Sequence, residues 1–335
     1  MTELATGSMS LRDRPVAIVT GASRGLGFLL ARELADRGHD LVVNARSEPG
    51  LAVAAAALQE RGAQVVTVPG DVADPALGQR LVDAATERFD RLDMVVANAG
   101  SIQVGPAFAM RASDFSNAMD VIFYGVLHPV LAALPVMKRR GAGRILVISS
   151  IGGKLPAPHL LPYVTAKHAA VGFAEGLRVE AIQHGITVTC AVPGLMRTGS
   201  PRNALFTGDQ AAEHRWFTLG DSLPLVSMDA ERAARQLVGA ALKGKPEVAP
   251  TPLAKIGMRV HGLAPSTTMR LVSLVNRLLP ADETPRPMRP GHAVEKPARW
   301  FDALTGMTRR AARRYHQHDD TTPDPAPDPA PSTHP

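Results

Sequence analysis

Short hydrophobic runs alternate with longer helical patterns from Pro15 to about residue 250. The apolar runs predict strands at 16–19, 40–45, 64–68, 92–97, 144–149, 186–191 and 247–248. Apolar residues with helical spacing predict helices at 25–37, 49–61, 75–89, 113–140, 161–184 and 229–242. Apolar strands that alternate with helices predict an α/β fold, in which a doubly wound, mostly parallel sheet carries helices on both faces.

Residues 20–27 follow the first predicted strand and open the first predicted helix, with the sequence TGASRGLG. Ligands of doubly wound sheets bind beyond the carboxyl ends of the strands, so this position is where binding chemistry is expected. Gly21, Gly25 and Gly27 allow a tight turn and a close approach of the backbone to a pyrophosphate at the helix N-terminus. The turn therefore predicts a dinucleotide site.

The second predicted strand ends in Asn44-Ala45-Arg46, without a carboxylate. An acidic residue at this place would accept a hydrogen bond from the ribose 2′-hydroxyl of NAD, whereas a basic residue suits the 2′-phosphate of NADP. Arg24 in the glycine-rich turn is placed to converge with Arg46 on such a phosphate. The alternative is that both arginines are solvated surface residues.

A serine, a tyrosine and a lysine follow the strand at 144–149. Ser150 lies at the strand end, and Tyr163 and Lys167 share a face of the next helix because they are four residues apart. A tyrosine has a pKa of about 10, which a nearby ammonium lowers. Together the three groups can protonate a carbonyl oxygen while hydride arrives from a nicotinamide.

These motifs together resemble the short-chain dehydrogenase/reductase family, in the family's order over residues 14–250. The other matching pieces are Asp71-Val72, Asn98-Ala99-Gly100 and Pro193-Gly194. The resemblance implies a seven-stranded Rossmann sheet that binds NAD(H) or NADP(H). Arg24 and Arg46 look like the NADP-preferring pattern, so NADP(H) is the expected cofactor.

The resemblance also implies a role for individual residues. Tyr163 is implied as the acid/base, Lys167 as the group that binds the nicotinamide ribose and lowers the tyrosine pKa, and Ser150 as the group that orients the substrate. The residues implied to bind the cofactor are Gly21, Ser23, Arg24, Gly25, Leu26, Gly27, Arg46, Asp71, Val72, Asn98, Ala99, Gly100, Tyr163, Lys167, Pro193, Gly194 and Thr198.

One position departs from the family pattern. The family commonly has an asparagine in the helix after the fourth strand, where it anchors a water of the proton relay, and this chain has Ile122 there. Isoleucine forms no side-chain hydrogen bond. Two functions stay open: an NADP(H)-dependent oxidoreductase that interconverts a hydrophobic ketone or aldehyde and its alcohol, or a cofactor-binding protein with weak or no turnover.

Residues 195–228 form a predicted lid over the nicotinamide end of the site. The apolar residues of this lid are Met196, Leu205, Phe206, Trp216, Phe217, Leu219, Leu223 and Leu225. Such a lid predicts a bulky hydrophobic substrate. The alternative is the ordinary packing of a helical insertion.

The chain changes character after residue 250, while residues 1–13 are predicted to be a flexible N-terminus. Residues 251–280 are predicted to be an amphipathic helical extension, with Leu271, Leu274, Val275, Leu278 and Leu279 on one face. This helix either docks on its own domain, which we favour, or makes peripheral contact with a membrane. Residues 281–335 are Pro-rich and basic, and are predicted to be largely disordered.

Composition narrows the partners and the compartment. Aromatic residues make up 4% of the chain, too few for a nucleic-acid stacking surface, and the net charge of +6 arises within residues 286–314. The single cysteine, Cys190, excludes a disulfide framework and a Cys-rich zinc site, and it fits a reducing compartment. No export signal is visible near the start, so we expect a cytoplasmic location, with membrane association of the extension as the alternative. The family resemblance implies a homo-oligomer.

Overall fold

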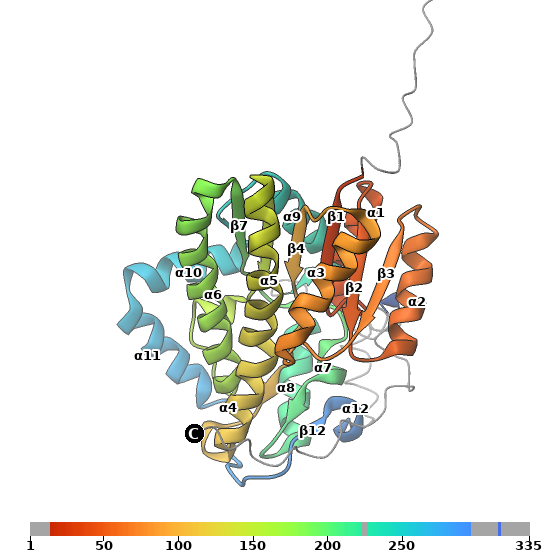
Figure 1. The fold of residues 1–335 in the computed structure, drawn as a ribbon. Coiled ribbons are helices and arrows are strands. Elements are labelled where there is room, and N and C mark those ends of the chain that lie inside the picture. The colour runs from red at the N-terminus through yellow and green to blue at the C-terminus, as the bar shows by residue number, and fades with distance from the viewer. Residues whose placement is uncertain (1–13, 223–226, 296–313, 316–335) are drawn as a thin grey trace, which may run out of the picture.

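The computed structural model describes residues 14–222, 227–295 and 314–315 of the 335-residue chain (Figure 1). A seven-stranded parallel sheet forms its centre, in the order β11-β7-β6-β4-β1-β2-β3. Its strands are β1 Val16–Thr20, β2 Asp40–Ala45, β3 Val65–Pro69, β4 Met94–Ala97, β6 Gly143–Ile148, β7 Ile186–Ala191 and β11 Glu247–Val248. The strand order reverses between β1 and β4, and this confirms the doubly wound α/β fold that the sequence predicted.

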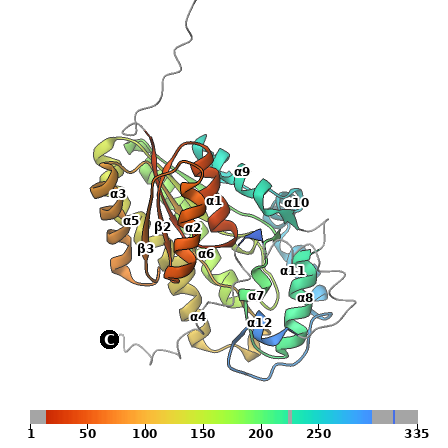
Figure 2. The same cartoon turned by 90° about the vertical axis from the view of Figure 1, so that its right-hand side faces the viewer.

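Helices cover both faces of the sheet (Figures 1 and 2). One face packs against α3, α5 and α6, and the other packs against α1, α2 and α9. Their bounds are α1 Gly25–Asp36, α2 Glu48–Gln59, α3 Pro75–Phe89, α5 Gly125–Arg140, α6 Leu161–Ala181 and α9 Ala230–Leu242. Central strands that are buried on both faces need apolar side chains at nearly every position, which explains the continuous hydrophobic runs in the sequence.

The predicted helix at 113–140 is interrupted in the structure by one wide turn. It consists of α4 (Ala112–Ala118), a π-helical turn η2 (Met119–Tyr124) and α5. By length and composition this stretch could cross a membrane, yet Val126 and Val130 lie in the core between the sheet and its neighbouring helices. Single π-helical turns inside α-helices are frequent at functional sites.

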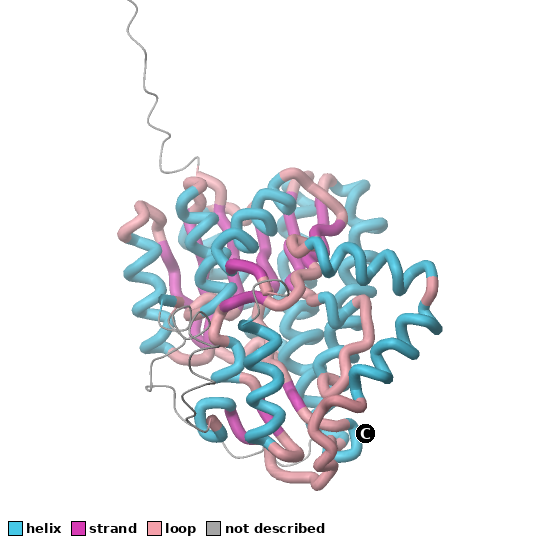
Figure 3. The backbone as a smooth tube through the Cα atoms, turned by 180° about the vertical axis from the view of Figure 1, so that it is seen from behind, coloured by secondary structure: helices cyan, strands magenta, loops and turns pink. Residues whose placement is uncertain are grey.

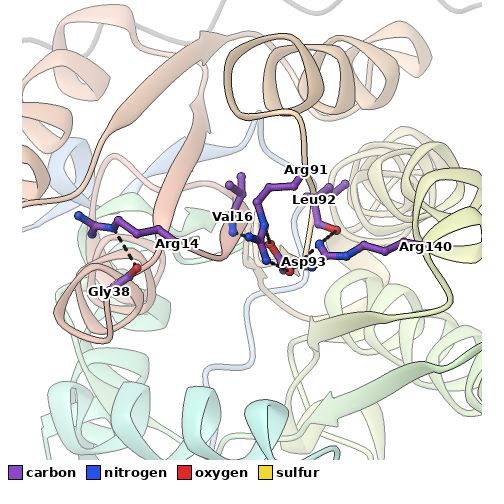
Figure 4. A network of polar contacts seen from close by, with 7 residues as sticks. All are labelled: Arg14, Val16, Gly38, Arg91, Leu92, Asp93 and Arg140. Carbon is purple, nitrogen blue, oxygen red and sulfur yellow. Dashed lines mark hydrogen bonds and ion pairs between the residues drawn. The ribbon is translucent and has the colours of Figure 1, made fainter. Parts of the chain in front are cut away.

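A polar network fixes the amino-terminal ends of the central strands (Figure 4). Asp93, directly before β4, accepts hydrogen bonds from the backbone of Val16 at 2.7 Å and from Arg91 at 2.9 Å, and pairs with Arg140 at 2.6 Å. Burial raises the pKa of Asp93, but the contacts with Arg91, Val16 and Arg140 together lower it by more. The pKa of Asp93 is therefore below its ordinary value, and the carboxylate stays charged. The network therefore ties β1, β4 and the end of α5 together, opposite the carboxyl ends of the strands.

The predicted lid contains short strands and helices that the sequence did not reveal. They are β8 Met196–Arg197, α7 Ser200–Asn203, β9 Leu205–Phe206, α8 Gln210–Ser222 and β10 Met228–Asp229. Strand β9 lies between β5 (Gln103–Val104) and β12 (Arg289–Pro290) in a small second sheet. Two-residue strands show no alternation of apolar and polar positions, so the sequence pattern could not indicate them.

Part of the segment predicted to be disordered packs on this lid. The Thr207 hydroxyl donates to the carbonyl of Arg286 at 2.8 Å, and Val294 in α12 (Gly291–Val294) lies in a cluster with Phe206 and Phe217. The prediction of a largely disordered 281–335 is therefore too broad at 281–295. Residues 296–313 and 316–335 lie outside the described residues.

The predicted amphipathic extension consists of two helices, α10 (Pro252–Leu263) and α11 (Pro265–Asn276), called the hairpin below. Ala264 separates them, because the residue before a proline avoids the helical conformation. Figures 1 and 3 show the hairpin projecting from the side of the domain. Only Ala254 is buried in α10, and no residue is buried in α11.

Candidate active site

The glycine-rich turn lies at the carboxyl end of β1, next to the strand-order reversal, where doubly wound sheets bind ligands. Gly21 has φ +65° and Gly25 has φ +57°, which other residues rarely adopt. A Cβ on Gly27 would lie 2.0 Å from the Gly21 carbonyl oxygen, so helix α1 packs directly on the turn. The Asn98 side chain donates to the Thr20 carbonyl oxygen at 3.0 Å and braces the turn from β4.

Two cations flank this turn without a compensating carboxylate. Burial, and secondly the charge of Arg46, lowers the pKa of Arg24, and no carboxylate of the described residues acts on it. Two neighbouring guanidinium groups and a helix N-terminus are donors suited to phosphate groups. These residues therefore offer donors for the phosphate groups of a dinucleotide.

The serine, tyrosine and lysine come together at the end of β6. Ser150 Oγ accepts from the Gly152 backbone at 3.1 Å, and a Cβ on Gly152 would lie 3.4 Å from the Tyr163 ring and 3.6 Å from Ser150 Oγ, so the two side chains are neighbours. Lys167 Nζ donates to the Ile148 carbonyl oxygen at 2.7 Å and lies 5.7 Å from the centroid of the Tyr163 ring. The structure thus places the three predicted catalytic residues in one site.

Burial dominates the protonation of this trio. Burial raises the pKa of Tyr163 to about 12, although the nearby Ser150 hydroxyl lowers it by a smaller amount. Burial also lowers the pKa of Lys167 to about 8. The resemblance implied that Lys167 lowers the tyrosine pKa, but the net change in this structure is upward because desolvation outweighs other influences. Tyr163 is accordingly a protonated hydrogen-bond donor at neutral pH.

The remaining predicted cofactor residues line the same edge of the sheet. A Cβ on Gly100 would lie 3.7 Å from Lys167 Nζ, which places the segment after β4 beside the trio. The Pro193 carbonyl oxygen accepts from the Ile151 backbone at 2.8 Å, so the ends of β6 and β7 are joined. Among the other predicted positions, Ser23 lies near Gly50, Val72 packs near Gly125, and Gly194 lies against Thr251. Leu26 and Gly27 lie in α1, and the Ala99 backbone donates to the Thr20 hydroxyl. Asp71 is exposed, and Thr198 is buried.

Asp221 on helix α8 is a site residue that the sequence analysis missed. Its side chain is 2% exposed, and its Oδ2 accepts from the Ser200 hydroxyl at 3.1 Å. Its charge raises the pKa of Tyr163, so the two side chains lie close enough to interact. Burial raises the pKa of Asp221 itself to about 7. Its spacing of 58 residues from Tyr163 left no local pattern that could have indicated it.

Asp221→Asn is expected to raise the melting temperature by roughly 3–8 °C at pH 8 and by little near pH 4. The folded-state pKa of Asp221 is raised from its ordinary 3.8 to about 7. The stability that Asp221 contributes in its protonated form is therefore fully present below pH 4 and is lost as the pH rises through 7. The amide cannot ionise and keeps an acceptor for Ser200. Thermal unfolding from pH 4 to 8, with exposed Asp36→Asn as control, measures this, and a pH-independent difference contradicts it.

A buried contact between His159 and Glu213 joins the loop before α6 to helix α8 of the lid. His159 Nδ1 lies 2.8 Å from Glu213 Oε1, and Trp216 Nε1 donates to the other oxygen of that carboxylate at 2.5 Å. Glu213 is fully buried, and Phe206 and Phe217 pack in a cluster with Val104, Ala204 and Val294. Part of the apolar lid therefore serves packing. Leu223 and Leu225 lie outside the described residues.

Ile122 lies in the π-helical turn and is fully buried. It packs with Ala118 and Ala166, and Tyr163 lies against the same cluster. The position of the family's asparagine is therefore beside Tyr163, and it packs in an apolar cluster.

The chain returns to the glycine-rich turn at Tyr315. The Tyr315 carbonyl oxygen accepts a hydrogen bond from the Gly25 backbone at 2.9 Å, and the Tyr315 ring is 3% exposed within the core under α1 and α9. Arg314 pairs with Glu231 of α9 at 2.9 Å. A backbone donor at the start of α1 is thus bound by a residue from the predicted tail.

The fold and the site define an oxidoreductase built on a dinucleotide-binding sheet with a serine–tyrosine–lysine trio. The sequence model of the short chain dehydrogenase family matches residues 15–205, which is more than half of the chain. This chain belongs to the short-chain dehydrogenase/reductase family.

Relatives and solved structures agree with this assignment. An 11-beta-hydroxysteroid dehydrogenase from Pinus massoniana is 35% identical over 239 residues, which cover 69% of this chain and 65% of that protein. A short chain dehydrogenase/reductase from Burkholderia phymatum in complex with NAD has a TM-score of 0.70 and 27% identity, over 77% of this chain and 96% of that one. An actinorhodin polyketide ketoreductase variant with NADPH has a TM-score of 0.64 and 29% identity, over 72% and 98%.

Proposed function

We propose that this protein is an NADP(H)-dependent oxidoreductase that interconverts a hydrophobic ketone or aldehyde and its alcohol. The observation that carries the proposal is the close placement of Ser150 and Tyr163 around Gly152, with Lys167 Nζ 5.7 Å from the centroid of the tyrosine ring. A bound nicotinamide would supply or accept the hydride. Tyr163 would donate its proton to the carbonyl oxygen, and Ser150 would hold that oxygen in place.

The charges beside the glycine-rich turn support NADP(H) as the cofactor. Family members are solved with either NAD or NADPH, so the family by itself leaves the choice open. In this chain β2 leads directly into Arg46, and Arg46 lies near the half-buried Arg24. Two cations at this place suit a 2′-phosphate, whereas a carboxylate would suit a free ribose hydroxyl.

The substrate class rests on two relatives and on the lid. Their names refer to a hydroxysteroid and to a polyketide. In this chain Trp216 and Leu219 lie on α8, the helix that also carries Asp221. Turnover with NADPH on matched steroid, polyketide-like and short polar ketones tests the proposal. Preference for the short polar ketones would contradict a hydrophobic substrate.

The second candidate, a cofactor-binding protein with weak or no turnover, rests on the buried Ile122 beside Tyr163. The same turnover measurements separate the two functions. NADPH binding without reduction of any carbonyl in the panel would favour the second candidate.

Ile122→Asn is expected to raise kcat without tightening NADPH binding, because an amide at this place supplies a hydrogen-bonding group for proton exchange. Ile122 is fully buried among apolar side chains, so an amide without a partner would cost about 1–3 kcal/mol of stability. The measurement is kcat with its solvent isotope effect, alongside the melting temperature. Ile122→Val is the control, and a stable asparagine variant that is no faster shows that the relay is not limiting.

Tyr315→Ala is expected to tighten NADPH binding several-fold. The Tyr315 carbonyl oxygen accepts the hydrogen bond of the Gly25 N–H. This donor lies at the start of α1, where a pyrophosphate oxygen would bind. The buried ring anchors that carbonyl, so its removal frees the donor. Fluorescence titration of NADPH measures the change, with Tyr124→Ala on η2 as a control. Weaker binding by the Tyr315 variant would show that the segment holds the cofactor instead.

We also propose a cytoplasmic homo-oligomer. Leu131 on α5 and Val179 on α6 are 48% and 77% exposed, which supports an apolar contact between copies along these helices. The one cysteine, Cys190, is buried and free, as suits a reducing compartment. Light scattering of the purified chain tests the oligomeric state.

A further inference from the structure

The hairpin exposes apolar side chains on both of its helices. On α10, Leu253, Ile256, Val260 and Leu263 recur at helical spacing on one side, with exposed fractions of 54%, 58%, 43% and 89%. On α11 and directly after it, Leu271, Leu274, Val275 and Leu278 form a second stripe, with exposed fractions of 57%, 54%, 52% and 85%. Soluble domains rarely leave contiguous apolar patches of this kind uncovered unless they bind something.

Helix α11 gains little from its own domain. No residue of its 12 is buried, and a helix of that length is marginal in water without packing on one face. Its contacts within the described residues are mainly with α10, which itself touches the domain around Ala254 and Met258. The helix was expected to dock on its own domain, but the apolar stripe of α11 is exposed.

The charges on the hairpin have one sign. Between Pro252 and Ala281 the chain carries Lys255, Arg259, Arg270 and Arg277 and no aspartate or glutamate. All four cations are exposed, and Arg270 and Arg277 flank the apolar stripe of α11. An apolar stripe bordered by cations is the pattern of helices that lie in the interface of an anionic membrane.

We propose that the hairpin docks this enzyme on an anionic lipid surface, with the two apolar stripes in the headgroup boundary and the four cations against lipid phosphates. A second copy of the chain is the poorer occupant. A symmetric contact between two hairpins would bring together like charges with no carboxylate of either hairpin to compensate them.

An open groove continues from the hairpin to the lid. Its lining includes Leu278 and Leu279 on one side and Trp216 and Leu219 of α8 on the other, with Asp209, Arg215 and Asp282 as its charged members. A docked hairpin would therefore place the lid near the membrane surface. If the proposed function holds, a hydrophobic carbonyl dissolved in lipid would have a short path to the site; the docking itself does not depend on that function.

Sedimentation of the full chain with vesicles tests the proposal. Binding is expected to vesicles of phosphatidylcholine with phosphatidylglycerol, and to fall when salt rises from 0.1 M to 1 M because the screening length shortens from about 10 Å to about 3 Å. Arg270→Gln with Arg277→Gln is expected to weaken binding about fivefold for each cation. Leu263→Glu with Leu274→Glu should weaken it more than tenfold, since both side chains would leave the headgroup boundary.

Val53→Glu on α2 is the matched control, because Val53 is 49% exposed. Helix α2 packs on the face of the sheet opposite the face that α10 contacts. This variant should bind vesicles like the unchanged chain. Circular dichroism and thermal unfolding verify that each variant is folded, so the test is independent of turnover. The absence of sedimentation at low salt overturns the proposal. So does a leucine variant that binds vesicles normally while light scattering shows an oligomer becoming monomeric, a result that would assign the hairpin to a contact between copies.

Discussion

Tyr163→Phe is expected to lower kcat by at least about a hundredfold while NADPH binding stays within about twofold of the unchanged protein. General acid catalysis contributes about 10²–10⁴-fold, and Tyr163 is the group that can protonate a carbonyl oxygen beside Ser150. The substitution removes the hydroxyl and keeps the ring that packs near Ile122 and Ala166, so the fold should be unaffected. Single-turnover kinetics and NADPH titration measure the two quantities.

The pKa values of the site sharpen this expectation. Burial holds the pKa of Tyr163 near 12, so the hydroxyl is protonated throughout the neutral range and suits carbonyl reduction. Lys167, with a pKa lowered by burial to about 8, should lose its charge at alkaline pH. Tyr124→Phe provides a control, because Tyr124 is 40% exposed. A Tyr163 variant with near-normal kcat would remove the tyrosine from the mechanism.

Arg24→Ala combined with Arg46→Ala is expected to remove a preference for NADPH over NADH that is at least tenfold in the unchanged protein. Hydrogen bonds to a charged group contribute about 1.5–3 kcal/mol each, and two guanidinium groups are available here. Burial and, secondly, the charge of Arg46 lower the pKa of Arg24, and a bound phosphate would offset both by stabilising the charged guanidinium. Alanine at both positions removes the phosphate donors and leaves the turn itself intact.

The measurement compares dissociation constants for NADPH and NADH in the unchanged protein and in the double variant. NADPH should lose affinity at least tenfold, and NADH should change by about twofold or less. Arg235→Ala, an exposed position on α9, controls for the loss of positive charge alone. Equal affinity of the unchanged protein for both dinucleotides would refute the proposed cofactor preference.

Much of the fold and of the site follows from local pattern. The run at 40–45 became β2 with the same bounds, because a parallel strand that is buried on both faces is mostly apolar, here with Asp40 and Asn44 as its two polar residues. Tyr163 and Lys167 share a helix face by their spacing of four residues, and the glycines of 20–27 are demanded by positive φ and close packing. The strand, the shared helix face and the turn all depend on residues that are close in the chain, so the sequence pattern is enough to predict them.

Contacts between distant segments could not be predicted in this way. Asp221 reaches Ser200 and the surroundings of Tyr163 through the packing of α8. Tyr315 lies more than 280 residues from Gly25 in the chain and yet binds its backbone. Strand β12 pairs with β9 although two residues show no period. Such pairings depend on which surfaces meet after the sheet has formed, and no local repeat encodes them.

The sequence by itself determined the order of the central-sheet strands and their flanking helices along the chain, the glycine-rich turn and the presence of a serine, a tyrosine and a lysine with the family's spacing. The tertiary structure alone decided the environment of those groups. It buries Tyr163 and raises its pKa, places Asp221 nearby, and leaves the stripe of α11 exposed. The physical reason is that desolvation and electrostatic coupling depend on what surrounds a side chain in space, whereas periodicity and turn chemistry depend on what adjoins it in the chain.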